Sequence, residues 1–127
     1  MRDLSRHGGF TLIELLVVMA IIATLLSIAT PRYFRSVDTA RESVLRENIS
    51  AIRDALDKYY GDTGTYPADL QELVSRRYLR QLPVDPITES NSTWILLPPP
   101  AGGGSGVYDV RSGAPGEASN GVAFGDL

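Results

Sequence analysis

An almost unbroken apolar run from Phe10 to Ala29 constrains this chain more than any other feature. Twenty residues of α-helix are about 30 Å long, which matches the hydrocarbon thickness of a lipid bilayer. A single segment in lipid satisfies its backbone hydrogen bonds only as a helix, so the run predicts a transmembrane helix over residues 10–30. A short polar segment, residues 1–9, precedes this helix and ends in two glycines.

Two ordinary interpretations compete for this run. A secretory signal peptide would be cut after Ala29, where Ser27-Ile28-Ala29 has the small-x-small pattern of a cleavage site. The run is longer than the apolar region of most signal peptides, however, and it contains an acidic residue, Glu14. A simple single-span anchor gives no reason for that residue either. Glu14 is therefore the residue that a functional interpretation has to explain.

An acidic side chain at the centre of a membrane helix costs about 2.5–3.5 kcal/mol on insertion scales, so it usually has a partner. The apolar run contains no Lys or Arg, and the partner is expected from elsewhere. If the chain were cut between Gly9 and Phe10, the new α-amino group would lie one helical turn from Glu14. That amine, on the same chain or on a neighbouring copy, would neutralise the carboxylate. Pairing between copies would also fix their register, so the sequence predicts assembly.

The string from Gly9 to Glu14, GFTLIE, resembles the prepilin signature of type IV pilins and of the pseudopilins of type II secretion. The resemblance implies that a prepilin peptidase cuts after Gly9 and N-methylates Phe10 on the cytoplasmic face. It also implies that Glu14 is the assembly glutamate and that Pro31 kinks the long helix. The protein would then span the bacterial inner membrane once, with its head in the periplasm and, after assembly, in a periplasmic filament.

Arginines flank the apolar run on both sides, which makes charge a poor guide to orientation. Arg2 and Arg6 precede the run, whereas Arg32, Arg35 and Arg41 follow it. By the positive-inside rule, this count does not favour a cytoplasmic N-terminus. The expected orientation, with the N-terminus in the cytoplasm, therefore depends on the resemblance.

Beyond the apolar run the sequence continues as an amphipathic helix. Pro31 lacks a backbone donor, so it predicts either a kink or a helix end followed by a new helix. Charges in the i,i+4 order, such as Glu42 and Arg46, fill the outer face, and Gly61–Gly64 ends the pattern. These features predict a long bent helix over residues 10–60. Its inner stripe has three- and four-residue steps and consists of Val37, Ala40, Val44, Leu45, Ile49, Ile52, Leu56 and Tyr59.

The remaining residues predict a small head that packs on this helix, so that the fold class is α+β and pilin-like. A short helix is expected over Pro67–Val74. Two proline-containing segments, Leu82–Pro86 and Pro98–Gly106, predict an extended turn and a flexible connection. The antiparallel strands are expected over Thr93–Leu97, Val107–Arg111 and, as a short third strand, Val122–Phe124.

The head also resembles that of the major, G-type pseudopilin of type II secretion. The absence of cysteine agrees with this resemblance, because many type IV pilins close a C-terminal loop with a disulfide. The family usually has an aromatic residue where this chain has Ile87. The resemblance implies a leader over residues 1–9, a transmembrane and assembly helix over 10–30, and a periplasmic head over 31–127. Its matching segments are Thr65-Tyr66-Pro67, Leu82-Pro83-Val84-Asp85-Pro86, Val107–Val110 and Ser112-Gly113-Ala114.

The late loop of that family often carries an acidic run that binds calcium. The corresponding loop here, residues 112–127, contains few carboxylates, and its candidate ligands are Glu117 and Asp126, with Asp109 upstream. Calcium takes six to eight oxygen ligands, so backbone carbonyls would have to complete the shell. The alternative is a loop that is held by its own turns without a metal.

The composition argues against an enzyme. The chain has no cysteine, its one histidine is His7 in the N-terminal tail, and no serine–base pair or phosphate-binding loop is evident. Its formal net charge is −3, whereas nucleic-acid-binding domains are normally basic. We therefore expect no catalytic residue, no cofactor other than the calcium considered above, and no nucleic-acid partner.

The function predicted first is a structural subunit of a type II secretion pseudopilus, a periplasmic fibre that drives protein export. The alternative is a type IV pilin or minor pilin for adhesion, motility or DNA uptake, with Arg76, Arg77 and Arg80 as its one candidate surface. The resemblance implies several partners. They are further copies of the chain, minor pseudopilins, an inner-membrane assembly platform with its ATPase, and the prepilin peptidase.

Overall fold

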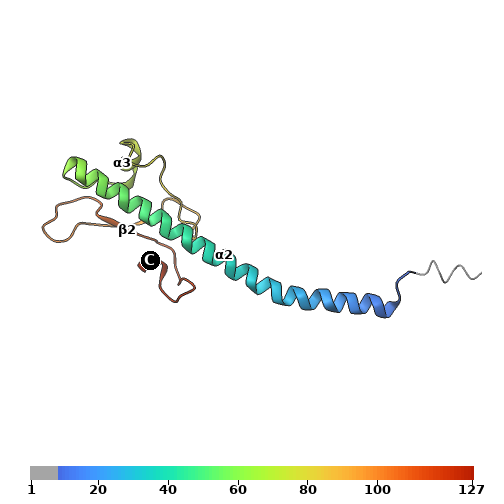
Figure 1. Ribbon diagram of the computed structural model, residues 1–127. Helices are drawn as coiled ribbons and strands as arrows, with labels where there is room; N and C mark the ends of the chain where they lie inside the picture. The colour runs from blue at the N-terminus through green and yellow to red at the C-terminus, as the bar shows by residue number, and fades with distance from the viewer. Residues whose placement is uncertain (1–8) are drawn as a thin grey trace, which may run out of the picture. The chain divides into compact units, whose positions relative to one another are not determined.

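The computed structural model describes residues 9–127, so the leader predicted over residues 1–9 lies outside them except for Gly9. A long helix, α2 at Leu12–Thr63, is followed by a short one, α3 at Leu70–Ser75 (Figure 1). Two strands, β1 at Ile95–Leu97 and β2 at Asp109–Arg111, come next, and a 3₁₀ helix, η1 at Phe124–Asp126, ends the chain. The predicted α+β fold is confirmed.

The chain divides into two compact units, and the division falls within α2, between Val37 and Asp38. The C-terminal unit has its core along one face of α2, whose buried residues recur at helical spacing. Full burial of one such aliphatic side chain stabilises a fold by about 1.5–3 kcal/mol. The core consists of Leu45, Ile49, Ile52, Ala55, Leu56 and Tyr59 from α2, together with Leu70, Leu73, Trp94, Val107 and Val110. The predicted stripe is thus confirmed from Leu45 to Tyr59.

The outer part of that stripe differs from the prediction. Ala40 is exposed, Val44 is 43% exposed, and both lie outside the core. Glu42, which was expected on the charged outer face beside Arg46, is instead 5% exposed. Its carboxylate accepts hydrogen bonds from the backbone N–H and the hydroxyl of Ser119, so the C-terminal loop covers it. The periodicity could not reveal this burial, because the partner of Glu42 lies far along the chain.

The long helix ends three residues later than predicted. Gly61 and Asp62 remain helical, and Gly64 follows the last helical residue with a positive φ of 74°. Its N–H donates to the carbonyl of Tyr60 at 2.8 Å, as in helix ends that turn into the left-handed region. Glycine adopts this conformation without the penalty that a Cβ would cause.

The short helix α3 begins at Leu70 rather than at Pro67. Asp69 is its N-cap, because the Asp69 side chain accepts a hydrogen bond from the N–H of Glu72 at 2.9 Å. The Glu72 side chain in turn accepts from the N–H of Ala68 at 2.8 Å. Pro67 and Ala68 therefore precede the cap.

The sheet has two antiparallel strands, in which Ile95 pairs with Arg111 and Leu97 with Asp109. Both strands are shorter than predicted. The third strand predicted over Val122–Phe124 is wrong: this segment makes only an isolated bridge between Glu117 and Ala123 before η1 begins. A glycine with a φ of 83°, Gly121, turns the chain just before it and leaves no room for an extended run.

The predicted turn at Leu82–Pro86 is organised by a buried carboxylate. Asp85 is fully buried, and its Oδ1 accepts a hydrogen bond from the N–H of Ile87 at 2.8 Å. Its Oδ2 accepts from the hydroxyl of Ser112 at 2.5 Å, which ties the turn to the segment after β2. Both carboxylate oxygens of Asp85 therefore serve the packing of the head.

Candidate functional site: the first turn of the long helix

The residues that carry the predicted assembly function stand at the start of α2. Gly9 and Phe10 precede the helix, and Thr11 is the residue immediately before its first helical position. The N–H of Glu14 donates to the Thr11 hydroxyl at 3.1 Å, and the N–H of Thr11 donates to Glu14 Oε2 at 3.3 Å. This reciprocal pair is a capping box, in which two backbone donors without helical partners are satisfied by side chains.

The capping box changes the account of Glu14 that the sequence provides. The carboxylate was expected to lack any partner in its own span, yet it has one in the backbone of Thr11. A negative charge in the first turn is also favoured by the helix dipole, which reduces the cost of placing it there. The T-x-x-E spacing from Thr11 to Glu14 is the sequence signal of this bond.

The capping box leaves the charge of Glu14 uncompensated. The bond to Thr11 comes from a neutral donor and uses only Oε2, and no ion pair of Glu14 is present in the part of the chain that the structure describes. A cation brought to this turn would therefore still gain from the carboxylate. An α-amino group at Phe10, created by cleavage after Gly9, would carry such a charge.

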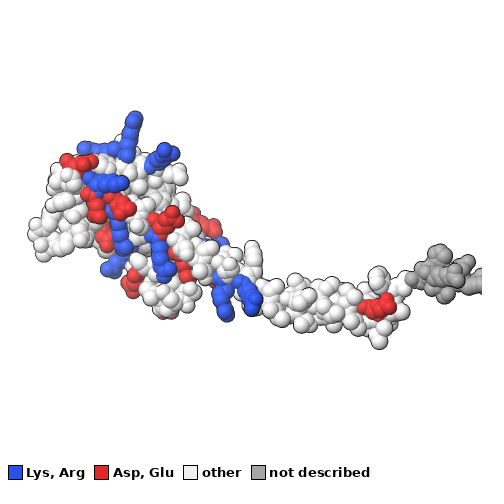
Figure 2. Space-filling model, in the orientation of Figure 1, with Lys and Arg blue, Asp and Glu red and all other residues white. Residues whose placement is uncertain are grey.

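The N-terminal part of α2 exposes its apolar side chains on all sides. Leu12, the first residue of α2, is 75% exposed, the residues that follow are exposed as well, and Phe10 just before the helix is 84% exposed. Figure 2 shows this stretch as white apart from a red area near its far end, and Glu14 is the one charged residue of the apolar run in the sequence. A helix that is apolar all round has to be covered by lipid or by other helices. Within residues 9–127, α2 is the one helix long and apolar enough to cross a membrane, with a mean hydropathy of 2.7 over its most apolar window.

The helix passes through Pro31 without interruption. A helix end at Thr30, one of the two alternatives left by the sequence, is therefore wrong, and the kink at Pro31 stays a prediction. Two hydroxyls in the span are satisfied within the helix: Thr24 donates to the carbonyl of Ala20 and Ser27 to that of Ala23, each at 2.8 Å. Bonds of this kind allow a hydroxyl to lie in an apolar surrounding.

The three candidate calcium ligands are not brought together as a group. Asp109 Oδ1 accepts from Arg53 Nε at 2.7 Å and from the N–H of Val110 at 2.8 Å, so it joins β2 to α2. Glu117 lies beside a hollow near Asp38, and Asp126 belongs to η1. Among the residues that the structure describes, no three His, Cys, Asp or Glu side chains are arranged to hold a metal ion.

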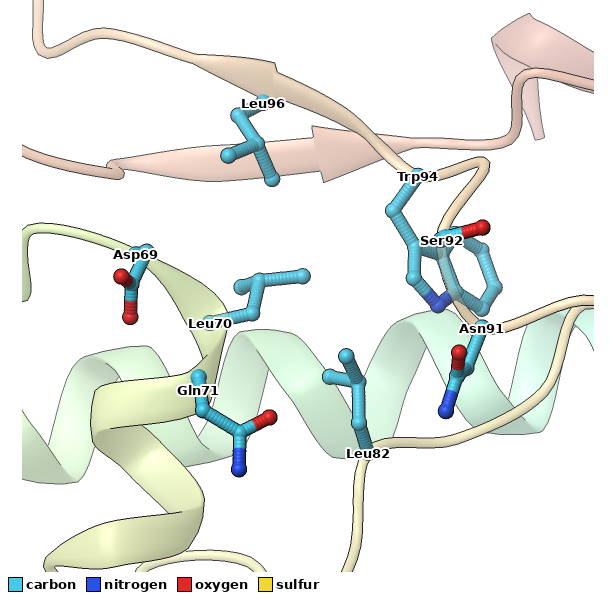
Figure 3. Close-up of a pocket in the computed structure, with 8 residues that line it drawn as sticks. All are labelled: Asp69, Leu70, Gln71, Leu82, Asn91, Ser92, Trp94 and Leu96. Carbon is cyan, nitrogen blue, oxygen red and sulfur yellow. The ribbon is translucent and has the colours of Figure 1, made fainter.

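A further hollow of the head lies between the start of α3 and β1 (Figure 3). Its only titratable group is Asp69, whose carboxylate already caps α3. The hollow therefore lacks a nucleophile paired with a base, which an active site for acid–base or covalent catalysis needs. Its lining residues are Asp69, Leu70, Gln71, Leu82, Asn91, Ser92, Trp94 and Leu96.

Comparison with known proteins supports the interpretation of both parts of the chain. Residues 4–30 match the family model described as the prokaryotic N-terminal methylation motif. The chain is 30% identical to the type II secretion system core protein G of Escherichia coli K12, over 91% of this chain and 86% of that protein. The chain belongs to the type II secretion core protein G family. The homologue from Pseudomonas aeruginosa is 34% identical over 84% of this chain and 82% of its own length.

A fimbrial protein of Eikenella corrodens, EcpC, is similar over a shorter region. It is 43% identical over 61 residues, which cover 48% of this chain and 40% of that protein. No solved structure matches the chain. The core protein G family is thus the group whose similarity extends through the head.

Proposed function

We propose that this member of the core protein G family is the major pseudopilin of a type II secretion system, a structural subunit that polymerises into a pseudopilus. One observation carries the proposal: a bare apolar helix opens with a single uncompensated carboxylate, Glu14, four positions after Phe10. The protein acts by assembling and not by catalysis. The fibre grows in the periplasm and drives the export of other proteins.

Assembly begins with removal of the leader between Gly9 and Phe10. The freed and methylated amine of Phe10 lies at the same end of α2 as Glu14, and it brings a positive charge to the first turn. In a fibre, the amine of one subunit meets the Glu14 carboxylate of its neighbour. A subunit in a wrong register would leave that charge bare in an apolar surrounding, which costs several kcal/mol.

The transfer of a subunit from the membrane into the fibre costs little hydrophobic free energy. The side chains of residues 10–30 leave lipid and enter a bundle formed by the same helix of other subunits, so they stay out of water throughout. The charge pair at Glu14 then supplies a directional preference that apolar packing alone does not. The assembly platform, its ATPase, the minor pseudopilins and the prepilin peptidase are the partners of this step.

The membrane-inserted state is a single-pass protein of the inner membrane, with the head in the periplasm. A type IV pilin is the second candidate function, and the similarity to a fimbrial protein favours it. That similarity covers 48% of the chain, whereas the Escherichia coli and Pseudomonas aeruginosa core protein G homologues cover 91% and 84% of it. The secretion function therefore has the wider support.

The experiment that tests the mechanism separates the charge of Glu14 from its capping bond. Glu14→Gln keeps an acceptor for the N–H of Thr11, because glutamine also completes a capping box. It removes the negative charge, so we expect normal membrane insertion and a large loss of fibres when the secretion system is produced at high level.

Thr11→Ala is the matched control. It removes the other half of the capping box at a cost of about 1 kcal/mol and leaves the charge in place. This variant should retain most fibre assembly. Wild-type fibre yield from Glu14→Gln would refute the pairing of charges between subunits.

A further inference from the structure

Two arginines and two aromatic residues follow the apolar part of α2 directly. Arg32, Tyr33, Phe34 and Arg35 come immediately after Pro31, and all four are exposed. Tyr33 is 66% exposed and Phe34 61%, although their rings contact each other edge-on at 5.8 Å. We call these four residues the collar. None of these four residues belongs to the capping box at Glu14 or to the core of the head.

Two arginines at this position of the chain have an energetic cost. Arginines on the exported side of a span oppose the positive-inside rule. Arg32 and Arg35 also lie three positions apart, where like charges on one helix face repel. No Asp or Glu lies within five positions of Arg32 on either side, whereas Asp38 lies three positions after Arg35. Figure 2 shows basic side chains where the white part of the helix ends.

We propose that the collar binds the headgroups of anionic phospholipids on the periplasmic side of the inner membrane, an inference that rests on the membrane placement proposed above. The helical length between Thr11 and Pro31 matches the hydrocarbon thickness, which brings the collar to the level of the headgroups. Tyr and other aromatic residues favour this level, since the ring lies in the apolar layer and the polar end meets water. An arginine guanidinium binds a phosphate through two parallel hydrogen bonds.

The head carries a basic cluster of similar size that lacks these features. Arg76 forms an ion pair with Glu72 at 3.7 Å and lies over the ring of Tyr59 at 5.7 Å, so its charge is partly engaged within the head. Arg77 and Arg80 belong to the head and do not adjoin an apolar helix. They provide a control with the same loss of charge at a place that the membrane does not reach.

The experiment measures which lipid surrounds the collar. The chain has no cysteine, so Thr30→Cys, at an exposed position of α2, gives a unique site for a small fluorophore. The labelled full chain is reconstituted as single subunits in vesicles of phosphatidylcholine and phosphatidylglycerol. In the first series, phosphatidylglycerol carries bromine near the top of its acyl chains, where bromine quenches a nearby fluorophore. In the second series, phosphatidylcholine carries the bromine instead. The quenching in the first series relative to the second gives the preference of the site around residue 30 for phosphatidylglycerol over phosphatidylcholine.

Each arginine at an anionic surface corresponds to a preference of about fivefold. We therefore expect at least about a fivefold preference for phosphatidylglycerol in the otherwise unchanged chain. Arg32→Gln with Arg35→Gln should bring the ratio close to one, whereas Arg77→Gln with Arg80→Gln should leave it unchanged. High salt should lower the preference, because the interaction is electrostatic.

Quenching by both lipids without a preference would overturn the collar proposal alone, and so would an equal loss in the two arginine pairs. The absence of quenching by either lipid would show that residue 30 does not approach the membrane, and the proposed membrane placement would fall as well. Since the subunits are unassembled, a defect in fibre growth does not affect the measurement.

Discussion

Glu42 on the long helix accepts two hydrogen bonds from Ser119, which lies 77 positions later in the chain. The N–H of Ser119 donates to Oε1 at 2.5 Å, and its hydroxyl donates to Oε2 at 2.8 Å. The Glu42 residue is 5% exposed, so these bonds replace most of its contact with water. The C-terminal loop is therefore held on α2 by one buried side chain.

Glu42→Ala should release this loop. Hydrogen bonds to a charged group contribute about 1.5–3 kcal/mol each, and we expect a loss of about 3 kcal/mol in the free energy of unfolding. Thermal unfolding of the full chain in detergent measures it, and hydrogen exchange at the Ser119 amide locates it. Glu47→Ala, at an exposed position of the same helix, is the control and should change little. Equal stability of the two variants would contradict the role of Glu42.

Asp85→Ala should destabilise the head by about 3 kcal/mol, since it leaves the N–H of Ile87 and the buried hydroxyl of Ser112 without their acceptor. Chemical unfolding followed by the fluorescence of Trp94 measures the change, because the Trp94 indole N–H bonds to Pro83 in the same turn. Asp54→Ala, at an exposed position of α2, is the control. An unfolding midpoint of Asp85→Ala within error of this control would count against the buried turn.

The contribution of Glu72 to stability should depend on pH. The N–H of Ala68, and after it the Tyr59 hydroxyl, donate to its carboxylate and hold the pKa of Glu72 below its ordinary value of 4.5. A lowered pKa stabilises the fold above the unfolded value, and this stabilisation is lost as the pH falls through the folded pKa. Glu72→Gln should thus lower the melting temperature at neutral pH, and the difference should shrink as the pH falls below 4.5 and through the folded pKa of Glu72.

The control for this pH dependence is Glu47→Gln, which replaces an exposed carboxylate of α2. Its melting temperature should follow the wild-type value at neutral and at acidic pH. A difference between Glu72→Gln and wild type that persists unchanged in acid would show that the hydrogen bonds stabilise the fold without regard to the charge.

Two glycines should respond to alanine in opposite directions. A Cβ at Gly113 would lie 2.2 Å from the carbonyl oxygen of Thr93, a backbone atom just before β1. Gly113→Ala should therefore cost about 2 kcal/mol or more, since the chain after β2 has to move away. Gly61 is helical, and nothing lies within 4 Å of its added Cβ, so Gly61→Ala should stabilise by about 0.5–1 kcal/mol. Melting temperatures that shift in the same direction would contradict this pair of predictions.

The parts of the fold that follow a local period could be predicted from the sequence. The stripe from Leu45 to Tyr59 repeats at helical spacing over about four turns, and the apolar run before Pro31 needs no partner to be recognised. The strands were harder to predict because each is only three residues long and the sheet has two strands. In strands this short, only a few side chains alternate between the buried and the exposed face. The turn at Gly121 also prevents a third strand from forming.

The long-range polar contacts could not be predicted. Glu42 matches an exposed i,i+4 pair in the sequence, and only the folded chain brings Ser119 to it. The same is true of Asp85 and Ser112, which are 27 positions apart. The bond between Thr11 and Glu14 is a different case, since the T-x-x-E spacing marks a capping box.

We propose that the carboxylate of Glu14 is neutralised in the fibre by an amino terminus created at Phe10. Tandem mass spectrometry of subunits taken from purified fibres tests this claim most directly. We expect the first peptide to begin with Phe10 and to carry one methyl group on its amine. Fibres built from chains that retain residues 1–9, or that begin at Thr30, would contradict the account, because no amine would then lie beside Glu14.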